Sequence, residues 1–363
     1  MGAAPMAYVL WTQFLKHNPA NPQWFDRDRF VLSPKHGSIL LYSLLHLTGY
    51  DLPLEQIKQF REWGSMTPGH PERDVTPGVE TSTGPLGQGL GNGVGLAMAE
   101  AHLAACHNRP GLEIVNHFTY GIVSDGDLME GVSSEAASLA GHLKLGKLIY
   151  LYDDNHVTLS AGTDLTFTED RARRFEAYGW HVQSVEDGND LAAIVGALRA
   201  ARGETDRPSL ILVRTHIGYG SPHKQDSFES HGSPLGAEEV QLAKQNLGWP
   251  AEPPFYIPEQ ARTFPRGDRT REINRDGMER QSFSVCQSVS GPGQRISTDQ
   301  AWRPARWMGQ RYSHFPRGRK GHGDPCRRGK VMNAVASRLP ALIGGSADLN
   351  PSDPYRTFRN GRF

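Results

Sequence analysis

Two short polar stretches could do chemistry, and each follows an apolar run. Residues 124–127 read Ser-Asp-Gly-Asp and come after one run, while residues 153–155 read Asp-Asp-Asn and close the next. Thirty positions separate Asp125 from Asn155. If both runs are parallel strands, their carboxyl ends share one edge of a sheet, where open α/β sheets bind ligands. The spacing therefore places two oxygen-bearing side chains at one crevice.

Those oxygens match the needs of a hard cation. Magnesium takes about six oxygen ligands, of which carboxylates commonly supply one or two and phosphates or water the rest. Asp125, the Asn155 side-chain oxygen and the Val157 carbonyl would form half of such a shell. Gly126 would let the backbone approach a diphosphate, and a helix starting near Glu130 would direct its amino end at the anion. Either stretch alone is more simply a turn, but together they predict a diphosphate-metal site.

The elements that must position these residues alternate between apolar runs and helical periods over residues 1–258. This pattern is typical of a parallel sheet covered by helices on both faces, so we expect an α/β fold with three α/β/α layers. Strands are predicted at 29–32, 117–124, 147–153, 180–185 and 209–215, and helices at 38–47, 87–106, 130–142, 172–178 and 191–201. A turn ending in Asp190 caps the last helix. The helix from Met1 into Lys16 begins without a capping residue, from which we expect the native start to lie upstream.

Bulk composition excludes several classes of function. Lys+Arg and Asp+Glu both number 39, so neither nucleic acid nor an anionic membrane is an expected partner. The chain has no apolar run of about 20 residues and no signal-like start, which predicts a cytoplasmic protein. Three cysteines, Cys106, Cys286 and Cys326, fit neither a disulfide framework nor a zinc site, and we expect free thiols.

The composition changes abruptly after residue 258. Residues 261–328 contain 14 Arg, one Lys and no Leu, and no helical or strand period survives there. A frame-shifted translation of GC-rich DNA would produce this excess, and a basic disordered linker is the alternative. We therefore divide the chain into a domain at 1–258, an aberrant segment at 259–328, the start of a second domain at 329–352 and an aberrant tail at 353–363.

The sequence resembles the transketolase family, which depends on thiamine diphosphate. Residues 124–126 followed by Asn155 are similar to that cofactor's Gly-Asp-Gly and distant Asn motif, with Ser124 in place of the first glycine. Further matching blocks lie at 67–72, 83–89, 217–222, 231–236 and 344–349, in family order. The likeness runs nearly continuously from Met1 to about residue 258 and returns from 329 to 352.

The resemblance implies roles for particular residues. Asp125, Asn155 and Val157 would bind Mg²⁺, or another divalent cation such as Ca²⁺ or Mn²⁺. Five more residues are expected at the thiamine diphosphate site. Gly84 and Leu86 would pack around the cofactor, Gly126 would let the backbone approach it, and Glu130 would order the loop. Asp348 would reach the cofactor from a second subunit.

Three histidines, His36, His70 and His231, match positions that line the family's substrate channel. Imidazole suits proton transfer to and from sugar hydroxyls near neutral pH, so all three are catalytic candidates. His36 and His231, with Ser352 at a phosphate-contacting position, are also predicted to bind the sugar-phosphate substrate. In front of His36, residues 33–35 (Ser-Pro-Lys) replace the family's usual small residues.

The likeness stops short at both ends. The family's Ser-Gly-His-Pro-Gly segment would precede Met1, and its cofactor-activating glutamate would follow Ser352. The resemblance thus implies transfer of a two-carbon ketol unit from a ketose phosphate to an aldose phosphate, by an enzyme of which this chain is a truncated, weakly active or inactive form. A homodimer is implied for the family but doubtful for this chain. The alternatives are a non-catalytic cofactor-binding fragment or pseudogene product, or another thiamine enzyme such as a dihydroxyacetone synthase or a split transketolase.

Overall fold

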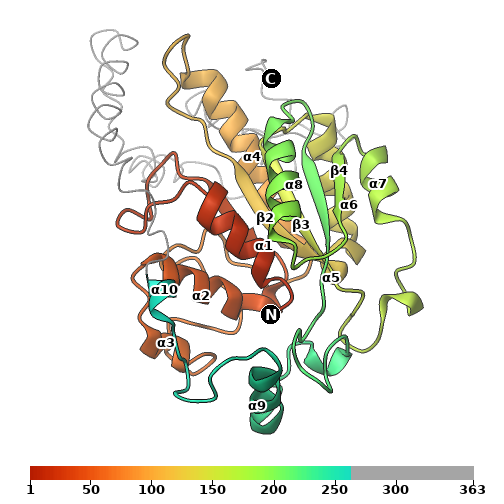
Figure 1. The fold of residues 1–363 in the computed structure, drawn as a ribbon. Helices are drawn as coiled ribbons and strands as arrows, with labels where there is room; N and C mark the ends of the chain where they lie inside the picture. Colours follow the sequence, from red (N-terminus) through yellow and green to blue (C-terminus); the bar gives the residue numbers. More distant parts are fainter. Residues whose placement is uncertain (263–363) are drawn as a thin grey trace, which may run out of the picture. The chain divides into compact units, whose positions relative to one another are not determined.

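The computed structural model describes residues 1–262. Residues 263–363 are outside the described part (Figure 1). The predictions that fall on them therefore stay predictions: the character of residues 263–328, the second domain at 329–352, the tail at 353–363, Asp348, Ser352, Cys286 and Cys326.

The chain divides into two compact units, Met1–Ala101 with Val115–Glu272, and His102–Ile114 with Ile273–Phe363. The first contains every strand found within residues 1–262 and the residues discussed below. Of the second, the structure describes only His102–Ile114. Among the described residues, no helix is long and apolar enough to span a bilayer.

A five-stranded parallel sheet forms the centre of the first unit, in the order β1-β2-β3-β5-β4 (Figure 1). Each predicted strand is present within two residues of its predicted bounds: β1 Arg29–Leu32, β2 Thr119–Ser124, β3 Leu148–Asp154, β4 His181–Val185 and β5 Ser209–Arg214. The first five residues of β3 are all buried. A strand with both faces covered reads as a continuous apolar run, which is why these strands were visible in the sequence.

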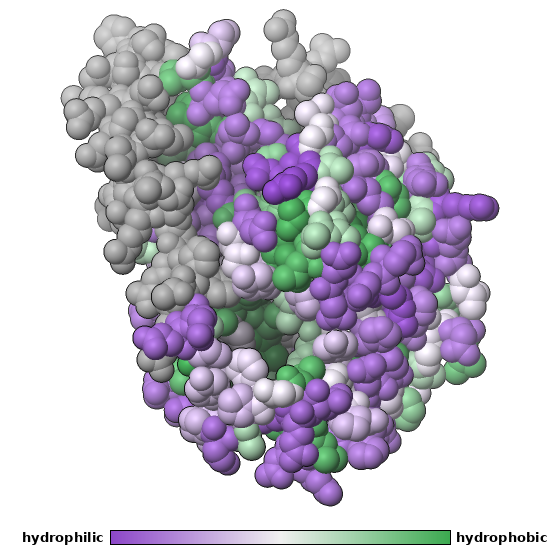
Figure 2. All heavy atoms as spheres, in the orientation of Figure 1, coloured by the Kyte–Doolittle hydropathy of each residue, from purple (hydrophilic) through white to green (hydrophobic). Residues whose placement is uncertain are grey.

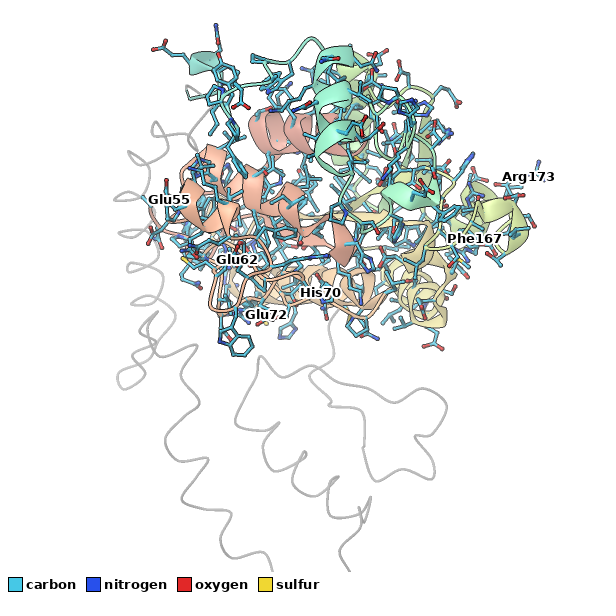
Figure 3. The ribbon with its side chains drawn as sticks, turned by 90° about the horizontal axis from the view of Figure 1, so that it is seen from below. Glu55, Glu62, His70, Glu72, Phe167 and Arg173 are labelled. Atoms are coloured by element: carbon cyan, nitrogen blue, oxygen red, sulfur yellow. The ribbon has the colours of Figure 1, made fainter. Side chains whose placement is uncertain are left out.

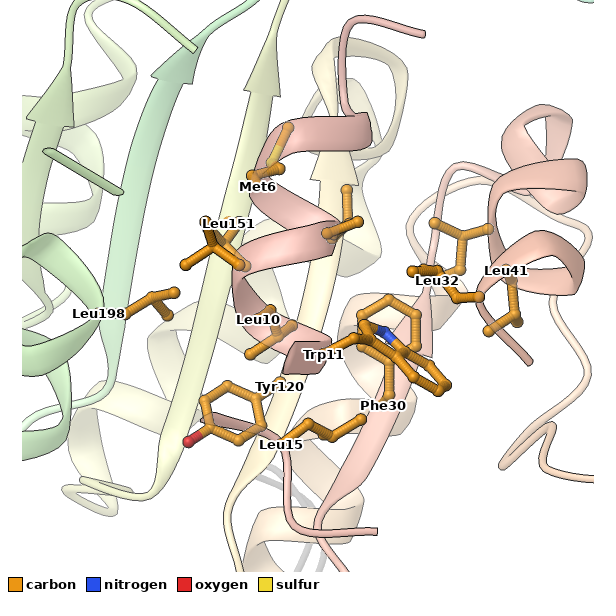
Figure 4. Packing of buried hydrophobic residues seen from close by; sticks show 14 of the residues in the cluster. Met6, Leu10, Trp11, Leu15, Phe30, Leu32, Leu41, Tyr120, Leu151 and Leu198 are labelled. Atoms are coloured by element: carbon orange, nitrogen blue, oxygen red, sulfur yellow. The ribbon is translucent and has the colours of Figure 1, made fainter. Parts of the chain in front are cut away.

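One face of the sheet is covered by α1 (Ala4–Val9), the wider turn η1 (Leu10–Phe14), α2 (Ser38–Thr48) and α8 (Leu191–Gly203). Figure 4 shows Met6 and Leu10 lying against the sheet near Leu151 and Tyr120. All four side chains are fully buried. Such burial contributes roughly 1.5 to 3 kcal/mol for each large apolar side chain.

The opposite face carries α4 (Gln88–His107), α6 (Gly131–His142) and α7 (Arg171–Ala177). Helix α4 lies very close to β3, since a Cβ built on Gly93 would stand 2.0 Å from the Tyr150 hydroxyl. Buried Trp180 fills the space beside α6 and donates a hydrogen bond from Nε1 to the Ala137 carbonyl at 2.8 Å. The three α/β/α layers are confirmed.

The shorter elements were not predicted. They are α3 (Leu54–Lys58), α5 (Asp125–Met129), α9 (Ala237–Asn246), α10 (Glu259–Arg262), and the 3-10 turns η2 (Lys35–Gly37), η3 (Thr163–Leu165) and η4 (Phe228–Ser230). The predicted cap at Asp190 is present, because its side chain accepts from the Ala193 amide. Helix α10 puts regular structure at the start of the segment predicted to be aberrant.

A buried histidine makes the stability of this fold depend on pH. His17 stacks on Tyr50 with ring centroids 5.7 Å apart, and burial lowers its pKa to about 4. The unfolded chain, whose histidine has an ordinary pKa near ~6.5, therefore takes up this proton first. Stability is fully present above the unfolded value and is lost as the pH falls towards 4.

We predict that His17→Phe, which keeps a ring against Tyr50 but takes no proton, reduces the loss of stability between pH 7 and pH 4 by roughly 3 kcal/mol. Urea denaturation of both proteins at the two pH values measures this difference. An equal loss in the variant would show that other groups cause the pH dependence.

Candidate functional site

The carboxyl ends of the strands all lie at one edge of the sheet, where α5 follows β2 (Figure 1). Figure 3 views this edge and shows His70 and Glu72 together, away from Phe167 and Arg173. On the face seen in Figure 2, an apolar hollow opens on the side towards which the strands point. The topology of the sheet therefore places the predicted polar residues at the same edge.

Asp125 is the first residue of α5 and is buried. Its Oδ1 accepts a hydrogen bond from the Tyr152 hydroxyl at 2.5 Å, whereas its Oδ2 is buried with no hydrogen-bond partner among the described residues. Burial raises the pKa of Asp125 to about 6, an effect that the Tyr152 hydrogen bond opposes. Buried polar atoms in proteins are nearly always satisfied, so this oxygen is suited to a cation.

Asn155 follows β3, the strand that pairs with β2. Its Oδ1 accepts from the Val157 amide at 3.0 Å, and its Nδ2 donates to Asp153 at 3.2 Å. A carbonyl oxygen has two lone pairs, so Oδ1 keeps one acceptor position beyond the turn that it closes. The loop is fixed further because the Thr163 amide donates to the His156 carbonyl at 3.0 Å.

Asp127 is fully buried and connects three segments. Its Oδ1 accepts from the Ser33 hydroxyl at 2.6 Å and from the Gly87 amide at 2.9 Å. Its Oδ2 accepts from the amide and hydroxyl of Ser124 at 3.1 and 3.2 Å. Burial raises the pKa of Asp127 and these hydrogen bonds oppose the rise. With both oxygens bonded, Asp127 is not a second cation ligand but the residue that holds the ends of β1 and β2 to the loop before α4.

The glycine-containing loop before α4 approaches α5 closely. A Cβ on Gly126 would meet the Leu86 side chain at 3.3 Å, whereas one on Gly84 would meet nothing within 4 Å. Gly87 has a φ of +76°, and a Cβ there would strike Glu130 at 2.8 Å. Gly126 and Leu86 therefore form one wall, and Gly84 faces open space.

Three features of this loop bear on the expectations from the sequence. Ser124, which stands in place of the family's first glycine, has an extended φ of −129° and is the N-cap residue of α5. Glu130 is exposed, and its side chain makes no hydrogen bond or ion pair within residues 1–262. Within the described residues the loop is ordered by Asp127 with Ser33 and Ser124, and a contribution from Glu130 stays a prediction. The helix predicted to start near Glu130 is present as α6, which begins at Gly131, and the short helix α5 lies between it and β2.

The three histidines come from distant segments and meet. The His36 ring lies 6.0 Å from that of His70 and 5.2 Å from that of His231, between centroids. Burial, with His231 and Lys35 nearby, lowers the pKa of His36 to about 4. Burial also lowers the pKa of His70, to which Lys35 and Arg61 add, and that of His231. These lowered pKa values favour the neutral form of each ring near pH 7, in which one ring nitrogen can accept a proton and the other can donate one.

Comparison with known proteins identifies the group to which this site belongs. Residues 1–285 match the family model described as transketolase, thiamine diphosphate binding domain. The chain belongs to the transketolase family. A transketolase from Geobacillus stearothermophilus is 50% identical over 368 residues, which cover 100% of this chain and 54% of that protein.

Solved transketolases share the fold. The structure from Leishmania mexicana is 41% identical with a TM-score of 0.83, and covers 98% of this chain. A Pichia stipitis transketolase in complex with sedoheptulose-7-phosphate is 38% identical with a TM-score of 0.86. This chain covers 53% of each. It therefore spans about half the length of its transketolase relatives.

Two residues of the site were missed in the sequence. Tyr152 sits inside a buried strand, where a tyrosine is an ordinary apolar choice, and nothing nearby indicates its bond to Asp125. Ser33 acts through a partner 94 positions away. Asp127 was visible within the polar stretch, but its role became clear only from its three bonded segments.

We predict that Asp127→Asn lowers the free energy of unfolding by roughly 2 to 4 kcal/mol. The amide nitrogen, itself a donor, would replace an oxygen that accepts hydrogen bonds from neighbouring donors. Chemical denaturation measures the change. Exposed Asp164 offers a matched control, and Asp164→Asn should stay within about 0.5 kcal/mol of the parent. Equal stabilities for the two variants would contradict the connecting role of Asp127.

Proposed function

We propose that this chain binds thiamine diphosphate through a divalent cation, Mg²⁺ or another such as Ca²⁺ or Mn²⁺. The ligands would be the Asp125 carboxylate, the Asn155 side-chain oxygen and the Val157 carbonyl. The observation that carries the proposal is the buried, unpartnered Oδ2 of Asp125. Within residues 1–262, no group of three or more His, Cys, Asp or Glu side chains is arranged to hold a metal. The remaining ligands would thus be phosphate oxygens and water, as Mg²⁺ commonly has.

The cofactor would lie against the glycine-containing loop. Gly84 leaves open space above the backbone, and Leu86 with Gly126 supplies an apolar wall beside the cation ligands. When bound, thiamine diphosphate supplies the nucleophilic thiazolium carbon of the reaction. We further propose that Asp348, beyond the described residues, contacts the cofactor of a second subunit.

The reaction we propose is transketolase chemistry, in which a two-carbon ketol unit passes from a ketose phosphate to an aldose phosphate. His36, His70 and His231 would exchange protons with the sugar hydroxyls. Neutral rings are suited to this, since an imidazole with a free lone pair accepts a proton and its N–H donates one. His36, His231 and Ser352 would hold the sugar phosphate, in a cytoplasmic enzyme that belongs to the pentose phosphate pathway.

A second candidate function is cofactor binding without turnover. The observation that favours it is coverage, since residues 1–363 span about half of the related transketolases. In this case the cation site would be intact, while the sugar-phosphate contacts and the homodimer would need protein beyond this polypeptide. Cofactor binding and turnover must therefore be measured separately.

We predict that Asp125→Asn has opposite effects on stability and on binding. The amide oxygen can still accept from Tyr152, and the gain from removing the buried charge is partly offset by the buried N–H donors that replace it, so the metal-free chain should gain no more than about 1 kcal/mol of stability. Calorimetric titration with thiamine diphosphate and Mg²⁺ should show affinity reduced at least about 100-fold, because a ligand to the cation is lost. Asp164→Asn serves as the control. Parental affinity in Asp125→Asn would exclude this site.

For activity, we predict that the 363-residue polypeptide alone shows little turnover with cofactor and Mg²⁺ saturating. Loss of a proton-transfer group typically costs about 10² to 10⁴ in rate, and an incomplete pocket costs more. A coupled assay with xylulose 5-phosphate and ribose 5-phosphate, on protein free of host transketolase, measures it. A rate above roughly one per second, ordinary for an enzyme, would show that this chain suffices for catalysis.

A further inference from the structure

His231 lies in the loop between β5 and α9, and hydrogen bonds connect this loop to both ends of α9. Glu239, in the first turn of α9, is buried although it carries a carboxylate. Its Oε1 accepts from the Ser221 hydroxyl and from the His223 amide, the latter at 3.0 Å. Its Oε2 accepts from His223 Nδ1 at 2.9 Å. At the other end of α9, Asn246 donates from Nδ2 to the Gly220 carbonyl at 3.0 Å.

Hydrogen bonds inside the loop extend this connection to His231. The Lys224 amide donates to Ser221 Oγ at 3.1 Å, and the Lys224 carbonyl accepts from Ser230 Oγ at 2.6 Å. Ser230 directly precedes His231. The part of the loop that Glu239 holds is therefore bonded to the residue beside the histidine.

The same loop is closely packed on itself. Gly218 has a φ of +65°, and a Cβ there would stand 2.5 Å from Ser230 Oγ. The Asp226 amide donates to the Ile217 carbonyl at 2.9 Å, which brings the two arms of the loop together. Because residues near Gly218 contact residues near Ser230, a displacement at Ser221 would also displace Ser230.

The carboxylate of Glu239 is charged throughout the neutral pH range. Hydrogen bonds from Ser221, and then from the amide and ring of His223, lower the pKa of Glu239 to about 2. A carboxyl group with a lowered pKa loses its contribution only as the pH falls through that value. The attachment of the loop to α9 therefore persists throughout the neutral range.

We propose that Glu239 is a positioning residue for His231: its carboxylate fixes Ser221 and His223, and through Lys224 and Ser230 it holds His231 against His36. The part that His231 plays towards a substrate rests on the proposed function. The anchoring itself depends only on the contacts above.

The test compares Glu239→Ala with Glu238→Ala, a neighbouring exposed carboxylate on the same helix. Ser221→Ala is a second test variant, which removes one donor and keeps the carboxylate. The readout is the rate at which diethyl pyrocarbonate modifies His231 in the cofactor-free chain, followed by peptide mass spectrometry. Buried His17 reports whether each variant is folded. The pH titration of the His231 ring, followed by NMR, is the second readout.

In Glu239→Ala we expect His231 to react at least about tenfold faster, since hydrogen bonds to a charged group are lost. Its titration midpoint should rise towards ~6.5, the value of a solvated imidazole. Ser221→Ala should change both in the same direction by less, and Glu238→Ala should change neither. An unchanged rate and midpoint in both folded test variants would overturn the proposal. So would a general rise at His17, which would mean loss of the fold.

The same proteins separate this proposal from the proposed function. Titration of the parental chain with thiamine diphosphate and Mg²⁺ tests the cofactor site alone, because Glu239 is not among its proposed ligands. Exposure of His231 in Glu239→Ala, together with no cofactor binding by the parent, would support the anchor and refute the function. Cofactor binding by the parent, with no change in His231 reactivity in Glu239→Ala, would support the function and refute the anchor.

Discussion

The buried carboxylate of Asp127 is the interaction on which the rest of the site depends. Its four hydrogen bonds connect the end of β1, the end of β2 and the loop before α4, so the loop and the strand ends form one rigid piece. Asp125 is two residues before Asp127 in α5, so the position of its carboxylate depends on these hydrogen bonds. A buried carboxylate is costly unless its acceptor positions are filled, and here the donors come from three segments that must all be folded.

The strands and the larger helices could be predicted because their signal is local. β3 and β5 are apolar runs buried on both faces, and the three layers follow from their alternation with helical periods. Asp125 and Asn155 could be predicted as neighbours because parallel strands end at a common edge. Such inferences need only the spacing along the chain and the rules of sheet topology.

The rest depends on contacts that spacing does not reveal. The bond between Ser33 and Asp127, for example, joins residues 94 positions apart. The family resemblance pointed to His36, His70 and His231, but only the structure shows how close their rings lie. The anchor at Glu239 was missed because an acidic residue in the first turn of a helix is ordinary on any surface.

The unpartnered oxygen of Asp125 also bears on how long such a protein persists. A charge buried without a partner weakens the empty form, whereas a ligand that binds only the folded chain stabilises it by an amount that grows with the logarithm of its free concentration. If thiamine diphosphate and a cation bind as proposed, the fraction of molecules unfolded at any moment falls as both become abundant. Since proteases act on unfolded chains, cofactor binding at Asp125 would also protect the chain from degradation.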